Sequence, residues 1–344
     1  MELYAIKING WENPMGFDYG VPQCSWKVRG NTGSRQETAR ISVGLDETLQ
    51  KVIFQKEGKL NSLGEPLDFP LKPYTRYWYT VAVRSDHGEE AVSQPCFFET
   101  GKLDDPWVGQ WLGVEDGDTH PEFQKTFSLP EKPRSARLYI CGLGLFEAYL
   151  NGGKAGNDLL TPFLNDYTEH FQYCTYDVTS LLAQDNTLSV LLGDGWYRGH
   201  FGLGEPTHYE RPLALIAELR MEFADGHTET LCSDSGWQYR SSFTTLSDIY
   251  NGETQDYTKA SGDWKQPVLI PAPGRLCDRY SSPLHYMESI PVKEVIHTPA
   301  GETVLDFGQN FAGHVVCTQP IPNGTAMTLE FGEVLQNGNF YHEN

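Results

Sequence analysis

Short β-rich runs separated by glycine turns constrain the fold more than any other feature of the sequence. Four apolar runs of strand length occupy residues 138–140, 145–150, 173–178 and 187–192. Asn151-Gly152 signals a tight turn after the second run, because both residue types tolerate positive φ. No amphipathic helix longer than two or three turns is visible in the sequence. The stretch therefore predicts a β-sandwich whose loops carry aromatic rings and acidic or amide side chains.

The composition supports an all-β chain and narrows the classes of partner. Aromatic residues make up 12% of the 344 residues, with 34 Gly and 21 Pro, a balance that favours many short strands over helices. The formal net charge is −20. This charge argues against nucleic acid or an anionic membrane as a partner, because a polyanion would be repelled. A net negative charge of this size suits a protein whose ligands are neutral or cationic. The alternative is that the charge only keeps the protein soluble.

The seven cysteines do not form a recognisable metal or redox motif. Their number is odd, their spacing is wide and no C-x-x-C occurs, which argues against a zinc or redox site. Cys141 and Cys174 lie inside strand patterns and are interpreted as small core residues. The N-terminus lacks an apolar signal core, and no apolar run approaches the length of a membrane span. We therefore expect a cytoplasmic protein with reduced thiols.

Residues 1–101 are predicted to form a first small sandwich. Apolar and aromatic side chains alternate with period two along residues 71–83, and Asp86-His87-Gly88 follows as a hairpin turn. The pattern resembles fibronectin type III domains, with Tyr77 at the position of the tyrosine corner. Such domains usually act as spacers.

Two further β units follow. Residues 102–291 are predicted to form a second, larger sandwich that begins with the strand around Trp107 and Trp111. A third unit, 292–344, contains predicted strands at 304–306 and 327–331. We expect this third sandwich to be truncated, and an exposed strand edge invites pairing, so residues 292–344 are predicted either to dimerise or to be disordered.

The order of several short motifs carries a family resemblance. The sequence has Gly-Leu-Gly, Glu-Ala-Tyr-Leu-Asn-Gly, Tyr-Asp-Val-Thr and Gly-Asp-Gly-Trp-Tyr within residues 142–197, and Asp-Phe-Gly-Gln-Asn at 306–310. This order resembles the N-terminal region of bacterial α-L-rhamnosidases, large glycoside hydrolases with a helical barrel. The resemblance covers nearly the whole chain but only the front part of such an enzyme.

The resemblance implies a fold and a role. The fold is all-β with tandem sandwiches: fibronectin III-like, then jelly-roll or galactose-binding-like, then a truncated sandwich. The role is that of an accessory, non-catalytic part of an enzyme that removes terminal α-L-rhamnose from glycosides, because the family's catalytic carboxylates lie in the barrel. The chain alone is therefore predicted to be inactive. A stand-alone lectin-like carbohydrate-binding protein and a purely structural fragment remain as alternatives.

No catalytic residue is assigned from the sequence. Glycosidases need a pair of carboxyl groups across the scissile bond. Glu253, Glu330 and Glu333 are better explained as solvated or interface carboxylates. His200 and His208 lie in one loop, but two histidines without a third nearby ligand are weak evidence for zinc.

A sugar site is expected where two loops of the second sandwich meet. A monosaccharide needs an aromatic ring and a few amide or carboxylate groups, and Ca²⁺ can hold two of its hydroxyls directly. Asn157 and Asp158 offer oxygens in the loop 156–161, and Trp196 and Tyr197 offer rings in the loop 193–212. The resemblance implies that Asn157 and Asp158 bind Ca²⁺. Glu205 and Glu210 are near in sequence and are expected to complete the shell, with the carbonyl of Arg211 or Pro212 as another oxygen. The alternative is that Asn157-Asp158 is a turn and that Trp196-Tyr197 belongs to the core.

Overall fold

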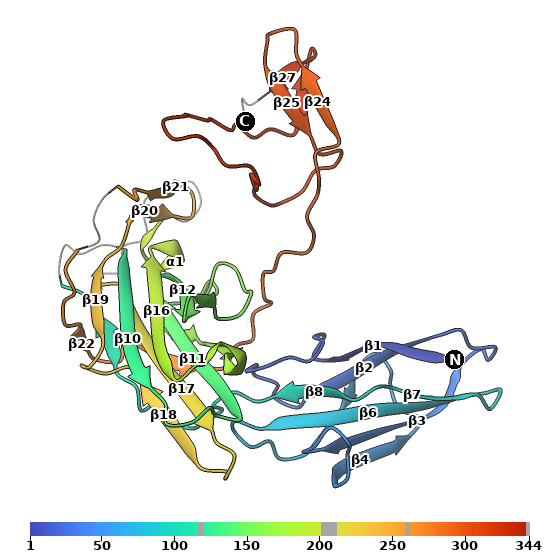
Figure 1. Ribbon diagram of the computed structural model, residues 1–344. Coiled ribbons are helices and arrows are strands. Elements are labelled where there is room, and N and C mark those ends of the chain that lie inside the picture. The colour runs from blue at the N-terminus through green and yellow to red at the C-terminus, as the bar shows by residue number, and fades with distance from the viewer. Residues whose placement is uncertain (116–119, 201–211, 259–261, 342–344) are drawn as a thin grey trace. The chain divides into compact units, whose positions relative to one another are not determined.

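The computed structural model describes residues 1–115, 120–200, 212–258 and 262–341 and is nearly all β, as predicted (Figure 1). The described part contains two short helical turns, η1 (Thr179–Leu181) and α1 (Gly195–Arg198). The chain divides into two compact units, Met1–His285 and Tyr286–Asn344. The first unit holds two sandwiches with separate hydrophobic cores. The predicted limits 1–101, 102–291 and 292–344 stay predictions.

The first sandwich is organised around its longest strand, β6 (Arg76–Ser85). Tyr77, Tyr79, Val81 and Val83 are buried on one face of this strand, as the period-two alternation predicts. The Tyr77 hydroxyl accepts the backbone N–H of Lys72 at 2.8 Å, which is the predicted tyrosine-corner contact. One sheet has the order β1-β2-β5 and the other β4-β3-β6-β7, with β8 also pairing β6. The remaining strands are β1 (Glu2–Ile8), β2 (Gln23–Arg29), β3 (Gln36–Gly44), β4 (Val52–Gly58), β5 (Glu65–Pro66), β7 (Glu90–Val92) and β8 (Cys96–Glu99).

The second sandwich packs a five-stranded sheet, β13-β12-β16-β10-β19, against a six-stranded sheet. The six-stranded sheet has the order β15-β11-β17-β9-β22, and β18 is its sixth strand, paired to β17. Its strands include all the predicted runs and the predicted first strand at Trp111. The bounds are β9 (Trp111–Gly113), β10 (Pro121–Ser128), β11 (Ser135–Leu143), β12 (Leu145–Leu150), β13 (Gly153–Lys154), β15 (Cys174–Asp177), β16 (Asp185–Gly193), β17 (Ala214–Glu222), β18 (Thr228–Cys232), β19 (Gln238–Ser241) and β22 (Val268–Ile270).

Burial along these strands follows their place in the sandwich. Alternate residues of β16 are buried, because only one face of that strand meets the core. Most residues of β17 are buried on both faces, since the segment after the first sandwich covers its outer face and hydrogen-bonds to Glu218. Cys141 and Cys174 are buried free thiols in this core, as predicted, and Trp237 is also fully buried.

Two short strand pairings also belong to the first unit. β14 (His170–Gln172) runs parallel to β23 (Arg275–Cys277), and β20 (Thr244–Asp248) forms a hairpin with β21 (Gly252–Gln255). The segment 275–285 continues from β23 to the first sandwich, where the Asp18 N–H donates to the Arg279 carbonyl at 2.7 Å. Among the described residues, no helix has the length and apolar character needed to cross a membrane.

The second unit contains two small hairpins. β24 (Glu294–His297) pairs with β25 (Thr303–Asp306), and β26 (Val334–Gln336) pairs with β27 (Asn339–Tyr341). The predicted strand at 304–306 is therefore present. The predicted strand at 327–331 is wrong for this structure. Its apolar side chains Met327, Leu329 and Phe331 are exposed, and the run pairs with no strand in the described part of the chain. A run of strand-forming residues becomes a strand only when another strand pairs with it.

Candidate functional site

Asp158 is buried and forms an ion-paired contact with the end of the first unit. Its Oδ2 accepts a hydrogen bond from Arg279 Nη1 at 2.7 Å, and its Oδ1 lies 2.5 Å from His285 Nε2. The guanidinium of Arg279 lies over the rings of Phe17 and Phe163, at 4.9 and 4.2 Å from their centroids. Asp158 thus anchors the segment 275–285.

These contacts do not fit the predicted Ca²⁺ site. Both carboxylate oxygens of Asp158 already face nitrogen groups, whereas Ca²⁺ needs several free oxygen ligands. Asn157 is exposed, and Pro212 is half-buried beside Gly113. No cluster of three or more His, Cys, Asp or Glu side chains suited to a metal occurs within the described ranges. Glu205, His208, Glu210 and Arg211 lie outside the described residues.

The two aromatic candidates lie in α1 and pack inward. The Tyr197 side chain is 1% exposed and meets the ring of Tyr167 edge-on at 5.3 Å. Trp196 is half-buried against the same core. The Tyr197 ring therefore presents no open face on which a sugar could stack, and its position agrees with the alternative that the sequence left open.

Residues 160–161 of the first predicted loop and residues 193–195 of the second nevertheless meet. Leu160 and Thr161 from one loop and Gly193 and Gly195 from the other line a single pocket of about 430 Å³. The rest of the lining comes from β12, β16 and the β20–β21 hairpin: Leu145, Phe146, Glu147, Leu191, Leu192, Ser242, Thr244, Ser247, Asp248, Ile249, Gly252, Glu253 and Gln255. We call this cavity the loop-end pocket.

Close backbone approach builds the loop-end pocket. The Phe146 N–H donates to the Thr161 carbonyl at 2.6 Å, which fixes the first loop against β12. A Cβ on Gly193 would lie 2.3 Å from Ser247 Oγ, so only glycine lets the β20–β21 hairpin come this close. The hairpin therefore forms one wall of the pocket.

Asp248 fixes the turn that carries this hairpin. Its carboxylate accepts backbone N–H groups of His200, Tyr250 and Asn251, each at 2.8 Å, and contacts His200 Nδ1 at 2.9 Å. Burial acts to raise the pKa of Asp248, but these hydrogen bonds outweigh it and hold the pKa well below its usual range. Asp248 is therefore a permanent anion that positions the turn.

Glu147 and Glu253 supply the acidic side of the pocket. Glu147 accepts hydrogen bonds from the Tyr149 hydroxyl at 2.5 Å and from Lys154 Nζ at 2.6 Å. Burial acts to raise the pKa of Glu147, but hydrogen bonds from Lys154 and Tyr149 leave it below its usual value. A glycosidase acid needs a raised pKa, so Glu147 is suited to accept ligand hydroxyls rather than to donate a proton in catalysis.

The sequence did not reveal most of the pocket lining. Ser247 lies on an ordinary strand. Glu147 begins the Glu-Ala-Tyr-Leu-Asn-Gly motif, which carries the family resemblance but does not mark a ligand site. From the sequence, Glu253 was interpreted only as a solvated or interface carboxylate. Its place in one pocket with the loop 156–161 depends on the folded structure.

The fold and the loop-end pocket together indicate a class of protein. Tandem antiparallel sandwiches, one with a small pocket of mixed polar and apolar lining at its loop end, belong to the β-sandwich modules that include lectin domains. Three family models then match along the chain. A "Rha78A-like, N-terminal immunoglobulin domain" matches residues 3–104, an "Alpha-L-rhamnosidase N-terminal domain" matches 131–285, and a "Bacterial alpha-L-rhamnosidase concanavalin-like domain" matches 296–344. The chain consists of N-terminal domains of the bacterial α-L-rhamnosidase family.

Curated relatives agree with this assignment, and a solved structure shares the fold. An α-L-rhamnosidase of Streptomyces avermitilis is 36% identical over 73% of this chain and 26% of its own length. Another, from Alteromonas sp., is 27% identical over 99% of this chain and 41% of its own length. The chain thus spans less than half of either relative. The crystal structure of the Streptomyces avermitilis enzyme with L-rhamnose has a TM-score of 0.76 and 20% identity, over 90% of this chain and 49% of that one, which shows a shared fold.

Proposed function

We propose that the chain works as the non-catalytic N-terminal part of an enzyme that releases terminal α-L-rhamnose from glycosides. We further propose that its loop-end pocket holds rhamnose or a related small sugar. The names of the curated relatives support the first statement. The pocket carries the second, because it combines carboxylates, hydroxyls and apolar side chains in a cavity within the size range of small-ligand sites.

The binding is expected to be weak. A monosaccharide held by a few hydrogen bonds gains only about −4 to −5 kcal/mol, which corresponds to millimolar affinity. Glu253 and Glu147 would accept sugar hydroxyls, and the apolar side chains of Leu145 and Leu160 would cover the apolar face of the ring. The Streptomyces avermitilis structure was solved with L-rhamnose, which makes this sugar the first ligand to test.

Calorimetric titration with L-rhamnose tests the pocket. We expect millimolar binding that Glu253→Gln weakens about tenfold, since a charge-assisted hydrogen bond contributes about 1.5–3 kcal/mol. Glu90→Gln, an exposed carboxylate on the first sandwich, is the matched control and should change nothing. Absence of heat at tens of millimolar sugar would mean that the domain is structural.

The Ca²⁺ prediction is tested in the same titration. Repeating it with EDTA separates the two possibilities, because the contacts of Asp158 predict no effect of chelation. A loss of sugar binding in EDTA would restore the predicted metal site. Asp158→Ala is a poorer probe, since it also leaves Arg279 without its buried partner.

Catalysis by this chain alone is not expected. The purified chain should not cleave a chromogenic α-L-rhamnoside, because the lowered pKa values of Glu147 and Asp248 do not suit a general acid. Turnover that is lost on Glu147→Gln or Glu253→Gln would contradict this assignment. Dimerisation through residues 292–344 and a cytoplasmic location also stay predictions, and light scattering of the full chain checks the first.

A further inference from the structure

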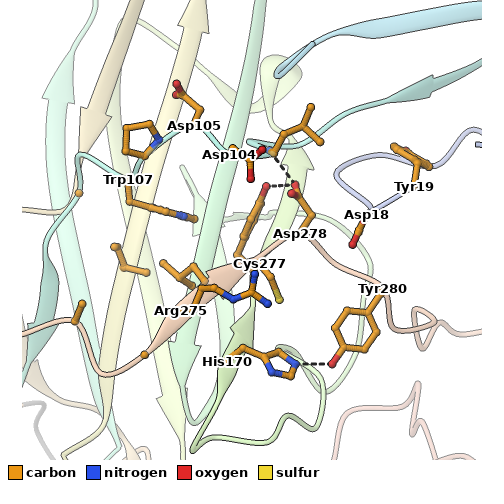
Figure 2. A pocket seen from close by; sticks show the side chains of 18 of the residues that line it. Asp18, Tyr19, Asp104, Asp105, Trp107, His170, Arg275, Cys277, Asp278 and Tyr280 are labelled. Atoms are coloured by element: carbon orange, nitrogen blue, oxygen red, sulfur yellow. Dashed lines mark hydrogen bonds between the residues drawn. The ribbon is translucent and has the colours of Figure 1, made fainter. Parts of the chain in front are cut away.

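We infer that the cleft between the first two sandwiches is a second binding site, for a neutral saccharide. The cleft has a volume of about 930 Å³ and shares no lining residue with the loop-end pocket. The first sandwich contributes Asp18, Tyr19, Gly20, Phe69 and Leu71, and residues 103–280 contribute the rest (Figure 2). The site is therefore created by the way in which two domains of one compact unit are joined.

Buried ion pairs hold the two walls of the cleft in place. Lys102 Nζ lies 2.5 Å from Glu218 Oε2, and both side chains are almost fully buried. Glu99 of the first sandwich accepts hydrogen bonds from Arg76 at 2.8 Å and from Arg137 of the second sandwich at 2.5 Å. The cleft is thus formed before any ligand arrives, which lowers the ordering cost of binding.

The chain between the sandwiches passes tightly beside the cleft. A Cβ on Gly101 would lie 2.1 Å from Asp278 Oδ1 and 2.4 Å from the Tyr173 hydroxyl oxygen. Tyr173 donates its hydroxyl to Asp278 and accepts the Lys102 N–H at 2.6 Å. Glycine at position 101 therefore lets a hydrogen-bonded floor form at the bottom of the cleft.

Aromatic and polar groups remain available above this floor. The Tyr280 side chain is 54% exposed, and its hydroxyl contacts His170 Nε2 at 2.7 Å. The parallel pairing of β14 with β23 sets Arg275 directly beside His170. Figure 2 shows Trp107 and Tyr280 on opposite sides of the pocket. The opening thus offers ring surfaces together with a guanidinium.

The balance of donors and acceptors points to a neutral polyhydroxyl ligand. Asp18 and Asp104 are exposed acceptors at the cleft, and Arg275 is an exposed donor. Vicinal sugar hydroxyls donate and accept at the same time, so they can serve both kinds of group. An anion would be repelled by the acidic side chains Asp18, Asp104, Asp105 and Asp278. A cation could pair with these carboxylates but would leave the Arg275 donor without an acceptor, whereas sugar hydroxyls serve both. The volume lies near the upper end of the range of about 300–1,000 Å³ for small-ligand sites, which favours more than one sugar ring.

Calorimetry with the disaccharide rutinose, α-L-rhamnosyl-(1→6)-glucose, tests this site on the full chain. The choice of a rhamnosyl disaccharide rests on the proposed function, so cellobiose serves as a second neutral probe and choline as a cationic one. We expect millimolar binding of a disaccharide that Arg275→Gln and Tyr280→Ala each weaken about tenfold. Tyr257→Ala, an exposed tyrosine just after the β20–β21 hairpin, is the matched control and should leave cleft binding unchanged.

The pattern of binding across the variants distinguishes the cleft site from the loop-end pocket of the proposed function. Disaccharide binding that is insensitive to Arg275→Gln and Tyr280→Ala, in variants whose melting temperature is unchanged, overturns the cleft site. Loss of binding in Glu253→Gln alone assigns the sugar to the loop-end pocket and also overturns it. Binding of choline in preference to both disaccharides overturns the ligand class. L-rhamnose binding lost in Glu253→Gln, together with rutinose binding lost in Arg275→Gln, supports two separate sites.

Discussion

Replacing Asp278 with asparagine should make the protein more stable at alkaline pH. Asp278 is 8% exposed and lies where the segment 275–285 meets the chain between the sandwiches. Burial raises the pKa of Asp278 to about 6, and the nearby carboxylate of Asp18 acts in the same direction. Tyr173 donates a hydrogen bond to Asp278, which opposes the rise only in part. An asparagine oxygen can still accept that hydrogen bond.

The size of the effect follows from the two pKa values. Asp278 has an ordinary pKa of 3.8 and a folded pKa of about 6, a difference that corresponds to about 3 kcal/mol. Because the folded pKa is the higher one, the favourable contribution of this carboxyl is complete below about pH 4. It is lost as the pH rises through about 6. The neutral amide carries no such penalty, so Asp278→Asn should gain up to about 3 kcal/mol at pH 8 and nothing at pH 4.

Guanidinium unfolding followed by tryptophan fluorescence at pH 4, 6 and 8 provides the measurement. The difference between variant and parent at each pH isolates Asp278 from the other titrating groups. Asp263→Asn, at an exposed position, is the matched control and should be neutral throughout. If Asp278→Asn destabilises the protein equally at pH 4 and pH 8, the carboxylate form is the one that the fold requires and the reasoning fails.

Three further substitutions test the contacts that build the fold and the pocket. Glu218→Gln should cost about 3–5 kcal/mol in unfolding free energy, because it leaves the buried ammonium of Lys102 without a counter-charge; a cost under 1 kcal/mol would contradict this. Gly16→Ala should lower the melting temperature, since its Cβ would lie 2.2 Å from Thr175 Oγ1 at a positive φ; an unchanged temperature would show that the two sandwiches move apart freely. Asp248→Ala should cost about 2 kcal/mol and weaken L-rhamnose binding, because it releases the hairpin turn; unaltered calorimetry would remove this turn from the pocket.

Local patterns predicted many of the individual strands and turns, whereas the order of the sandwiches came from the family resemblance. The alternation in residues 71–83 predicted the buried face of β6, and Asn151-Gly152 predicted the turn between β12 and β13. Both signals involve neighbours in sequence, so the physics that produces them is visible without a structure. The run 327–331 failed by the same reasoning, because a strand also needs a partner and sequence pattern does not supply one.

The candidate site was predicted only in part, because its contacts join distant residues. The meeting of loops 156–161 and 193–212 was inferred from the general architecture of sandwiches, and the loop-end pocket confirms that Leu160 and Gly193 share one cavity. The role of Asp158 depends on Arg279, 121 residues away, and Glu218 finds Lys102 across 116 residues. A carboxylate beside an amide therefore resembles a metal ligand in sequence, although in the fold it is the partner of a buried guanidinium.

The glycines show most clearly why hairpin turns are easier to predict from the sequence than ligand-binding sites are. Gly152 and Gly226 lie in hairpin turns with open space where a side chain would be, and their Asn-Gly and Asp-Gly contexts reveal this role. Gly101 and Gly193 have no such context. Each is required because a neighbour lies too close for a Cβ, Asp278 in the first case and Ser247 in the second. Gly101 lies against Asp278 and Tyr173, which line the cleft, and Gly193 itself lines the loop-end pocket. Alanine at either position should therefore disturb ligand binding at its own site and leave the other site intact.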